Sequence, residues 1–287
     1  DELLGEKVAA FETLLANSTQ ACTEELPSTE VFTSEPLNFR MRATFNVWRT
    51  DEGADFVMYN QGDSRTPHQV LNYPMGSLRM NELMPVVREQ ICKVDELRER
   101  INDVSFLTTT TGEALVAITY NRPIENEVWG AAAADLAAAM GSGVRVIGRS
   151  RKVKIVVGDD TVKETLHVTN RGACTYKQAE GVFTQPNAKV CEKMLSWAHK
   201  VTAGGDKNND LCELYCGNGC FTVALAPLPA WRAALAALPG PTAAWPLPRP
   251  RAWAGLGFGF GFGFGFGFGF GFGFWLGLGL GFGFGFG

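Results

Sequence analysis

The stretch LCELYCGNGCFTVALA, residues 211–226, decides the fold of this chain. It opens with Leu211 to Tyr215, which are typical of a buried strand, and closes with Phe221 to Ala226, which are typical of a helix start. Gly217, Asn218 and Gly219 form the turn between them. Doubly wound α/β domains build nucleotide-sized sites from a strand, a glycine-rich turn and a helix start, since glycine lets the backbone pass close to a ligand. We therefore predict that an α/β cofactor domain begins here.

The residues before this stretch predict a separate α+β region. Helical spacing is present at 1–17, 80–100 and 127–140, and a further helix is predicted after this region at 191–201. Strands are predicted at 39–48, 56–59, 105–111, 113–120, 144–147 and 153–157. Because helices and strands occur in alternating groups, we expect a domain of about 160 residues with an antiparallel sheet.

Composition limits the class of protein. The 287 residues suffice for two domains, and the formal net charge of −4 means that any nucleic-acid binding must rest on a local patch. Seven cysteines, an odd number without a secretory signal, favour reduced thiols, so we expect a soluble, non-secreted protein of the cytoplasm or an organelle. No apolar run is long and continuous enough to predict a membrane span.

The C-terminal residues 227–287 differ from the rest. A segment rich in proline and alanine leads into a Gly-Phe alternation that holds 16 of the 33 glycines and 12 of the 20 phenylalanines. Such a repeat has no helical period, and half its residues lack side chains that could pack. One interpretation is that the coding frame is lost near Ala226; the other is a genuine low-complexity segment, disordered or prone to aggregate. We assign no fold to it.

Two motifs together point to a family. FTQPNA at 183–188 is followed by LCELYCGNG at 211–219, and this pair resembles the RNA uracil-5 methyltransferases, with the tRNA (uracil-5-)-methyltransferase branch fitting best. FRMRATFNVW at 39–48, FLTTTTGEALVAITY at 106–120 and VRVIGRSRKVKI at 144–155 also look like their counterparts in that branch. The resemblance covers about residues 1–226.

The resemblance implies a fold and a reaction. It implies an α+β RNA-recognition region over 1–175 and a truncated, Rossmann-like class I methyltransferase domain over 176–226. The family uses S-adenosylmethionine and flips the target uridine out of tRNA, with the T-arm as the expected partner. A cysteine thiolate adds to C6, C5 takes the methyl group, and a carboxylate removes the C5 proton. No metal, membrane or protein partner is implied.

The cofactor residues of the family carry over in part. Gln185 matches a glutamine that contacts the cofactor, and Tyr215 matches the tyrosine at the end of the first strand. Gly217, Asn218 and Gly219 match the turn beneath the methionine part of the cofactor. The chain departs from the family at Cys220, where the branch usually has an asparagine, so one contact is expected to be lost.

The catalytic residues of the family do not carry over. Neither Asp-Pro-Pro nor Cys-Asn-Pro occurs in the sequence, and the acidic residue that would hold the cofactor ribose is missing. No cysteine has the context of the nucleophile; the seven are Cys22, Cys92, Cys174, Cys191, Cys212, Cys216 and Cys220. We therefore identify no catalytic residue, and expect an inactive chain with weakened cofactor binding.

Several basic and aromatic residues are candidate RNA contacts. The candidates are Arg40, Arg42, Phe106, Arg149, Arg151 and Lys152. The two strand arginines and the basic turn at 148–152, together with Lys154, could position phosphates, and Phe106 could stack on a base. The alternatives are solvated cations and, for Phe106, core packing.

Other motifs have a structural alternative. Cys212, Cys216 and Cys220 are spaced C-x3-C-x3-C, which misses the C-x3-C-x2-C of radical S-adenosylmethionine enzymes by one residue, so we interpret them as small buried side chains. The three histidines lack ligand spacing. Glu213 is expected to be buried and hydrogen-bonded near the cofactor, or to serve structure alone.

Two other functions remain open. A non-catalytic RNA-binding fragment is favoured by the missing catalytic motifs. A class I methyltransferase with a different substrate is disfavoured by FTQPNA and the N-terminal resemblance.

Overall fold

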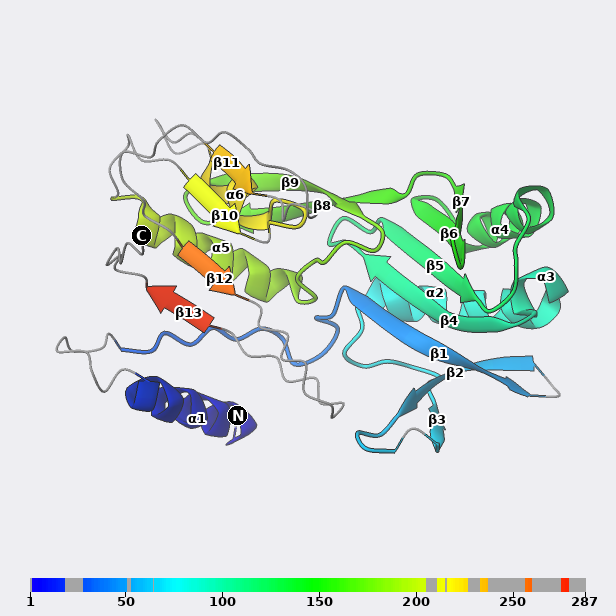
Figure 1. The fold of residues 1–287 in the computed structure, drawn as a ribbon, viewed down its shortest axis with the longest axis horizontal. Coiled ribbons are helices and arrows are strands. Elements are labelled where there is room, and N and C mark those ends of the chain that lie inside the picture. Colours follow the sequence, from blue (N-terminus) through cyan, green and yellow to red (C-terminus); the bar gives the residue numbers. More distant parts are fainter. Residues whose placement is uncertain are drawn as a thin grey trace, which may run out of the picture. The chain divides into compact units, whose positions relative to one another are not determined.

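The structure is a computed structural model, and it describes residues 2–18, 28–50, 53–63, 65–204, 211–214, 216–226, 233–236, 256–259 and 275–278. The chain divides into two compact units, 1–33 and 34–287. Helix α1 (Glu2–Ser18) lies in the first unit, buries none of its residues, and confirms the helix predicted at 1–17 (Figure 1).

The second unit is built on a seven-stranded sheet. Its strands lie in the order β3-β2-β1-β4-β5-β6-β7. Their bounds are β1 (Arg42–Thr50), β2 (Gly53–Tyr59), β3 (Pro67–Gln69), β4 (Ile101–Thr108), β5 (Ala114–Tyr120), β6 (Val144–Ser150) and β7 (Val153–Val157). Each predicted strand of this region corresponds to one of these, while β3 was not predicted.

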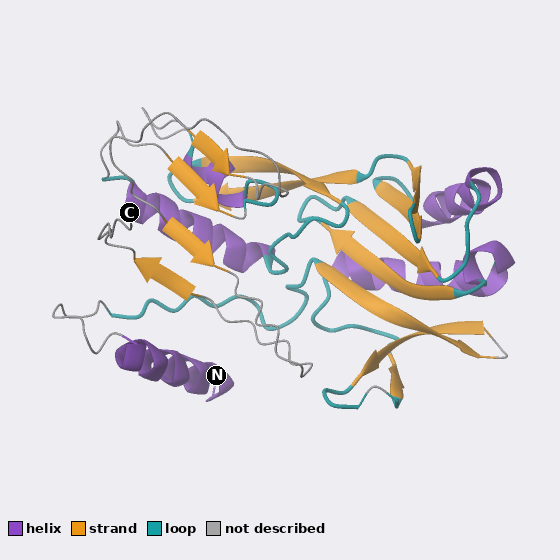
Figure 2. Ribbon diagram, in the orientation of Figure 1, coloured by secondary structure: helices purple, strands orange, loops and turns teal. Residues whose placement is uncertain are grey.

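Three helices cover one face of this sheet (Figure 2): α2 (Leu78–Lys93), α3 (Asp95–Arg98) and α4 (Asn126–Met140). The helix predicted at 80–100 is thus two helices, which meet at the extended backbone of Val94. An aromatic cluster lies under α2, in which Phe45 contacts Phe56, Tyr73 and Phe106 with ring centroids 5.3–6.0 Å apart. This face holds the main core because apolar side chains alternate along the strands.

One pairing contradicts the predicted antiparallel sheet. β5 and β6 run parallel, while every other neighbouring pair in the sheet is antiparallel. Parallel neighbours need a crossover connection, and the alanine-rich α4 between these two strands supplies it. The region is therefore a mixed sheet with helices.

Close packing of β6 against α4 yields a stability prediction. A Cβ on Gly148 would lie 2.7 Å from Cζ2 of Trp129 and 2.9 Å from Cδ1 of Ile124. Both neighbours are buried, so we expect Gly148→Ala to lower the free energy of unfolding by about 1–3 kcal/mol. Urea unfolding followed by circular dichroism measures this change.

Gly130 in α4 is the matched control. A Cβ there meets nothing closer than 3.9 Å. Because alanine favours helix over glycine, we expect Gly130→Ala to stabilise the protein by up to about 1 kcal/mol. Equal effects at the two glycines would contradict the packing of β6 on α4.

A second core follows the first sheet. It combines β8 (Thr161–Val168), β9 (Gly172–Ala179), α5 (Ala188–Thr202), β10 (Leu211–Leu214) and α6 (Cys220–Leu225). α5 confirms the helix predicted at 191–201, and β10, the turn and α6 confirm the predicted strand, turn and helix start. The predicted domain boundary at 175 stays a prediction.

The hairpin of β8 and β9 was not predicted. Its buried side chains on β8 include Val162, Glu164, Leu166 and Val168. The charged Glu164 thus stands at a position where an apolar side chain is expected. It interrupts the alternation of apolar and polar residues by which a strand is recognised in the sequence.

Three short strands lie beyond Ala226. β11 (Ala233–Ala236) pairs in parallel with β10, and β12 (Leu256–Gly259) pairs antiparallel with β13 (Trp275–Leu278). β10, α6 and β11 therefore form a strand–helix–strand unit with parallel strands. Within the described residues, no helix combines the length and the apolar character needed to cross a membrane.

Candidate functional site

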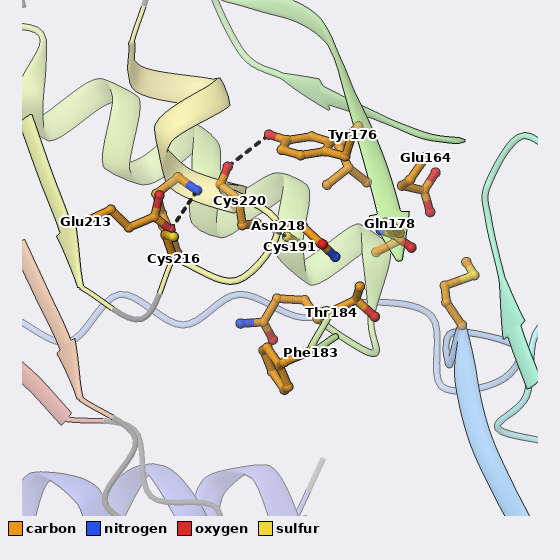
Figure 3. A pocket seen from close by; sticks show the side chains of 15 residues that line it. Glu164, Tyr176, Gln178, Phe183, Thr184, Cys191, Glu213, Cys216, Asn218 and Cys220 are labelled. Atoms are coloured by element: carbon orange, nitrogen blue, oxygen red, sulfur yellow. Dashed lines mark hydrogen bonds between the residues drawn. The ribbon is translucent and has the colours of Figure 1, made fainter. Parts of the chain in front are cut away.

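A pocket of about 790 Å³, part of it open to solvent, lies beside the glycine-rich turn (Figure 3). Its walls come from the residue before β1, the β8–β9 hairpin, the FTQPNA segment, α5, β10, and the turn and first residues of α6. The lining residues are Met41, Glu164, Leu166, Tyr176, Gln178, Phe183, Thr184, Gln185, Ala188, Cys191, Glu213, Cys216, Asn218, Cys220 and Phe221. The two motifs that carry the resemblance thus meet at one cavity.

The turn takes its shape from glycine and from Glu213. Gly217 and Gly219 have φ of 54° and 71°, in the left-handed region that other residues rarely adopt. Glu213 on β10 is buried, and its carboxylate accepts hydrogen bonds from the backbone N–H of Phe221 (3.3 Å) and Thr222 (2.7 Å) and from Oγ1 of Thr222 (2.5 Å). These bonds hold the start of α6 against β10, as Figure 3 shows in part.

Four polar side chains of the pocket have no partner within the described residues. Nδ2 of Asn218 is fully buried and makes no hydrogen bond. The side chains of Gln178, Thr184 and Gln185 likewise hydrogen-bond to none of the described residues, although Thr184 is buried. Because an unpaired buried polar atom is costly, this arrangement fits a pocket whose ligand completes the hydrogen bonds.

The FTQPNA segment is anchored on both sides. The carbonyl of Pro186 accepts a hydrogen bond from the N–H of Met41 at 2.7 Å, just before β1. Asn187 caps α5, since its Oδ1 accepts from the N–H of Val190 at 3.0 Å, and its Nδ2 donates to Oγ of Ser34 at 2.7 Å. Gln185 is therefore held in place beside the turn.

Glu164 lies at the end of the pocket nearest the first sheet. Its carboxylate accepts from the N–H of Thr110 (3.0 Å) and of Thr165 (2.9 Å), and from the hydroxyl of Thr110. Burial raises the pKa of Glu164, against the lowering effect of these hydrogen bonds. Sequence reasoning missed Glu164 and Gln178 as pocket residues because it missed the hairpin that carries them.

The ionisable side chains that line the pocket include carboxylates but no cations among the described residues. Glu164 and Glu213 line it, and among the described lining residues there is no lysine, arginine or histidine. A ligand with a positive charge is therefore favoured over an anionic one.

The predicted cofactor residues that the structure describes lie at or beside the pocket. Gln185 and Asn218 line the pocket, and Gly217 and Gly219 shape the turn beside it. Tyr215 lies outside the described residues. Cys220, the departure from the family, lines the pocket and its carbonyl accepts a hydrogen bond from Oη of Tyr176 at 3.0 Å.

The burial of Phe106 contradicts the prediction that its ring stacks on an RNA base. The sequence allowed this ring to stack on a base, but only 2% of the residue is exposed, within the aromatic cluster under α2. It faces the helix-covered side of β4, so core packing, the alternative, is the right interpretation.

The basic turn is smaller than predicted. Gly148, Arg149 and Ser150 belong to β6, which leaves Arg151 and Lys152 in the turn itself. Arg149 forms a bidentate ion pair with Glu180, which raises the pKa of Arg149, and Lys154 pairs with Asp160 at 2.8 Å. Arg151 and Lys152 are exposed and pair with no described residue, so they remain the accessible cations of this region.

The strand arginines lie near the FTQPNA segment rather than on an open face. Arg42 is half-buried and donates to the carbonyl of Val182 at 3.2 Å. Burial, with a smaller contribution from the charge of Arg40, lowers the pKa of Arg42. Arg40 donates from Nε to the carbonyl of Arg42 at 3.0 Å.

Metal binding finds no support in the described residues. They contain no group of three or more His, Cys, Asp or Glu that could hold a metal ion. The side chain of Cys212 lies outside the description, and Sγ of Cys220 is 3.5 Å from Sγ of Cys191.

Comparison with known proteins identifies the family. The family described as tRNA (Uracil-5-)-methyltransferase matches residues 1–237, beyond the 1–226 expected from the motifs. This chain belongs to that family. The match extends past Ala226 and includes β11.

Curated relatives in the family are bacterial enzymes. The tRNA/tmRNA (uracil-C(5))-methyltransferase of Azoarcus sp. (strain BH72) is 45% identical over 204 residues, which is 71% of this chain and 54% of that protein. Its counterpart in Ectopseudomonas mendocina (strain ymp) is 44% identical over 223 residues, or 76% of this chain and 60% of that protein. The chain thus spans between half and two thirds of the length of these relatives.

A solved structure was also matched. The tRNA (uracil-54, C5)-methyltransferase of Pyrococcus abyssi, in complex with S-adenosyl-L-homocysteine, aligns with a TM-score of 0.48 and 13% identity, over 66% of this chain and 47% of that one.

Proposed function

We propose that this chain carries the RNA-recognition region and the first part of the Rossmann-like cofactor domain of an S-adenosylmethionine-dependent enzyme that methylates C5 of a uridine in tRNA. The observation that carries the proposal is the pocket in which FTQPNA and the glycine-rich turn meet. Membership of the family and two relatives named as tRNA/tmRNA (uracil-C(5))-methyltransferases support the substrate.

The residues present fit the cofactor. Asn218 offers a buried unpaired amide, and Gln178 and Gln185 offer both donors and acceptors to the polar groups of a nucleoside and an amino acid. The carboxylates of Glu164 and Glu213 favour a cationic ligand, and S-adenosylmethionine is positively charged at its sulfonium and its ammonium group. When bound, the cofactor supplies an electrophilic methyl group.

The role of the chain's own residues is to bind and orient. Gln185 and Asn218 would fix the cofactor between α5 and the turn, while Met41, Leu166 and Phe183 line the pocket with apolar surface that excludes water. The accessible cations Arg151 and Lys152 would contact RNA phosphates, and we place the T-arm of tRNA as the element bound.

Binding of RNA without catalysis is the second candidate. Addition to C6 needs a thiolate, yet the pocket thiols have no basic neighbour among the described lining residues. The neighbouring Cys220 thiol and burial together raise the pKa of Cys191 well above the ordinary value for a thiol. While the Cys220 thiol is its neighbour, Cys191 is thus a poor nucleophile for addition to C6.

Three measurements on the full chain separate these functions. Calorimetry measures S-adenosylhomocysteine binding, electrophoretic shift measures binding of a T-arm hairpin, and tritiated S-adenosylmethionine reports methyl transfer. Binding of both ligands with transfer supports the enzyme, and binding of the hairpin without transfer supports the second candidate. A chain that does not bind the hairpin would contradict both.

Asn218→Ala tests the cofactor site. Removing the unpaired amide should weaken S-adenosylhomocysteine binding roughly three- to tenfold, because one hydrogen bond contributes about 0.5–1.5 kcal/mol. Asn102→Ala is the control, since Asn102 is an exposed asparagine on β4 outside the pocket. Equal affinities for the two variants would count against this ligand position.

A further inference from the structure

Two thiols meet at the wall of the pocket. Sγ of Cys191 on α5 lies 3.5 Å from Sγ of Cys220, the first residue of α6, and both side chains line the cavity (Figure 3). The two residues are 29 positions apart in the sequence, and their contact ties α5 to the start of α6.

The two thiols differ in accessibility. Cys191 is buried, with 2% of the residue exposed, whereas Cys220 is half-buried at the pocket. A small reagent that enters the pocket therefore reaches Cys220 first, and Cys191 lies within contact distance behind it. Such an arrangement provides an attacking thiol and a resolving thiol.

We propose that Cys191 and Cys220 form a redox-responsive pair, which closes to a disulfide with a low-molecular-weight disulfide as oxidant and thereby weakens ligand binding in the pocket. The proposal that the disulfide forms depends only on the contact between Sγ of Cys191 and Sγ of Cys220. Its effect on binding rests on the proposed function.

The exchange proceeds in two balanced steps. Cys220 loses its proton and its sulfur attacks one sulfur of the small disulfide, so that a mixed disulfide forms and one small thiolate leaves and takes up a proton. Once Cys220 is held in the mixed disulfide, its thiol no longer raises the pKa of Cys191. Cys191 then loses its proton and attacks the sulfur of Cys220, and the second small thiolate leaves and takes up a proton. The protein dithiol is oxidised by two electrons, and one small disulfide is reduced to two thiols.

Closure would change the pocket. Two sulfurs in a disulfide are about 2.05 Å apart, so the present 3.5 Å contact must shorten, and we expect this to draw the start of α6 towards α5. Cys220 follows Gly219 directly, so the movement reaches the turn that carries Asn218. Asn218 on the turn and Gln185 on the FTQPNA segment would then no longer be spaced so that one ligand can bind to both.

The covalent link is tested first, by oxidising the full chain with oxidised glutathione and digesting it with trypsin without reduction. Cys191 lies in the peptide 190–193, and Cys220 shares the peptide 208–232 with Cys212 and Cys216, so fragmentation must assign the linked sulfur. We expect a Cys191–Cys220 link and a fall in free thiols from seven to five. A stable glutathione adduct on Cys220, or a link that excludes Cys191, would overturn the proposal.

The effect on binding is tested by calorimetry with S-adenosylhomocysteine before and after oxidation. We expect the affinity of the wild type to fall by roughly tenfold or more, which corresponds to about 1.4 kcal/mol, and to recover with dithiothreitol. For Cys220→Ala, compared with its own reduced form, the ratio of the two affinities should stay near one. Cys191→Ala should instead keep an unresolved glutathione adduct on Cys220 and form no internal link.

Cys174→Ala is the matched control, because Cys174 belongs to the same core but does not line the pocket. It should respond to oxidation as the wild type does. Absence of binding in the reduced wild type would instead refute the proposed function, and the linked peptides would still decide the thiol pair. A linked protein with unchanged affinity would refute the regulatory part alone.

Discussion

Replacing Phe106 with alanine is expected to lower the free energy of unfolding by about 3–5 kcal/mol, the range for a large aromatic side chain removed from a core. Phe106 packs edge-on against Phe45 and Phe56, with ring centroids 6.0 and 5.8 Å away. The rigid strands β1, β2 and β4 leave the neighbours little freedom to fill the cavity. Urea unfolding followed by circular dichroism measures the loss.

Phe106→Leu provides the control, because it keeps most of the buried volume and should cost less than the alanine variant. Its affinity for a T-arm hairpin should equal that of the wild type, since the ring does not reach the surface. A leucine variant that folds normally but loses hairpin binding would restore Phe106 as an RNA contact.

The second large effect is expected at Glu213. Glu213→Ala removes the acceptor for two backbone N–H groups and one hydroxyl, all at the buried start of α6. Each unsatisfied buried donor costs about 1–3 kcal/mol, so α6 and the turn should open locally. Hydrogen–deuterium exchange over residues 216–226 should rise, and S-adenosylhomocysteine binding should be lost.

Glu89→Ala gives the comparison for loss of a carboxylate. Glu89 is exposed and forms an i,i+4 ion pair with Lys93, so its removal should change stability by less than about 0.5 kcal/mol. If exchange over 216–226 were the same in the Glu213 and Glu89 variants, the buried carboxylate would not hold the turn.

The strands and helices with clear periodicity were predictable, and the exceptions have physical causes. Phe45 belongs to the alternation that predicted β1, and the run of alanines predicted α4. The β8–β9 hairpin was not recognised because Glu164 occupies a buried position, where contacts with Thr110 compensate the loss of solvation. Those contacts join residues 54 positions apart, which no local pattern contains.

The site was predictable to the extent that its motifs are local. FTQPNA and the glycine-rich turn located Gln185, Asn218 and the two glycines. The ion pair between Arg149 and Glu180 could not be anticipated, because the position of Glu180 depends on the hairpin that precedes it. The same holds for the meeting of Cys191 and Cys220, which depends on how α5 packs against α6.

The hydrogen bond between Met41 and Pro186 has a consequence for synthesis on the ribosome. The two residues are 145 positions apart, and the carbonyl of Pro186 completes the backbone pairing just before β1. At about 5–20 residues per second, Pro186 is translated roughly 7–30 s after Met41. For that interval the N–H of Met41 lacks this partner, while β1 can already pair with β2 and β4. The wall that Met41 gives to the pocket is therefore a late product of folding.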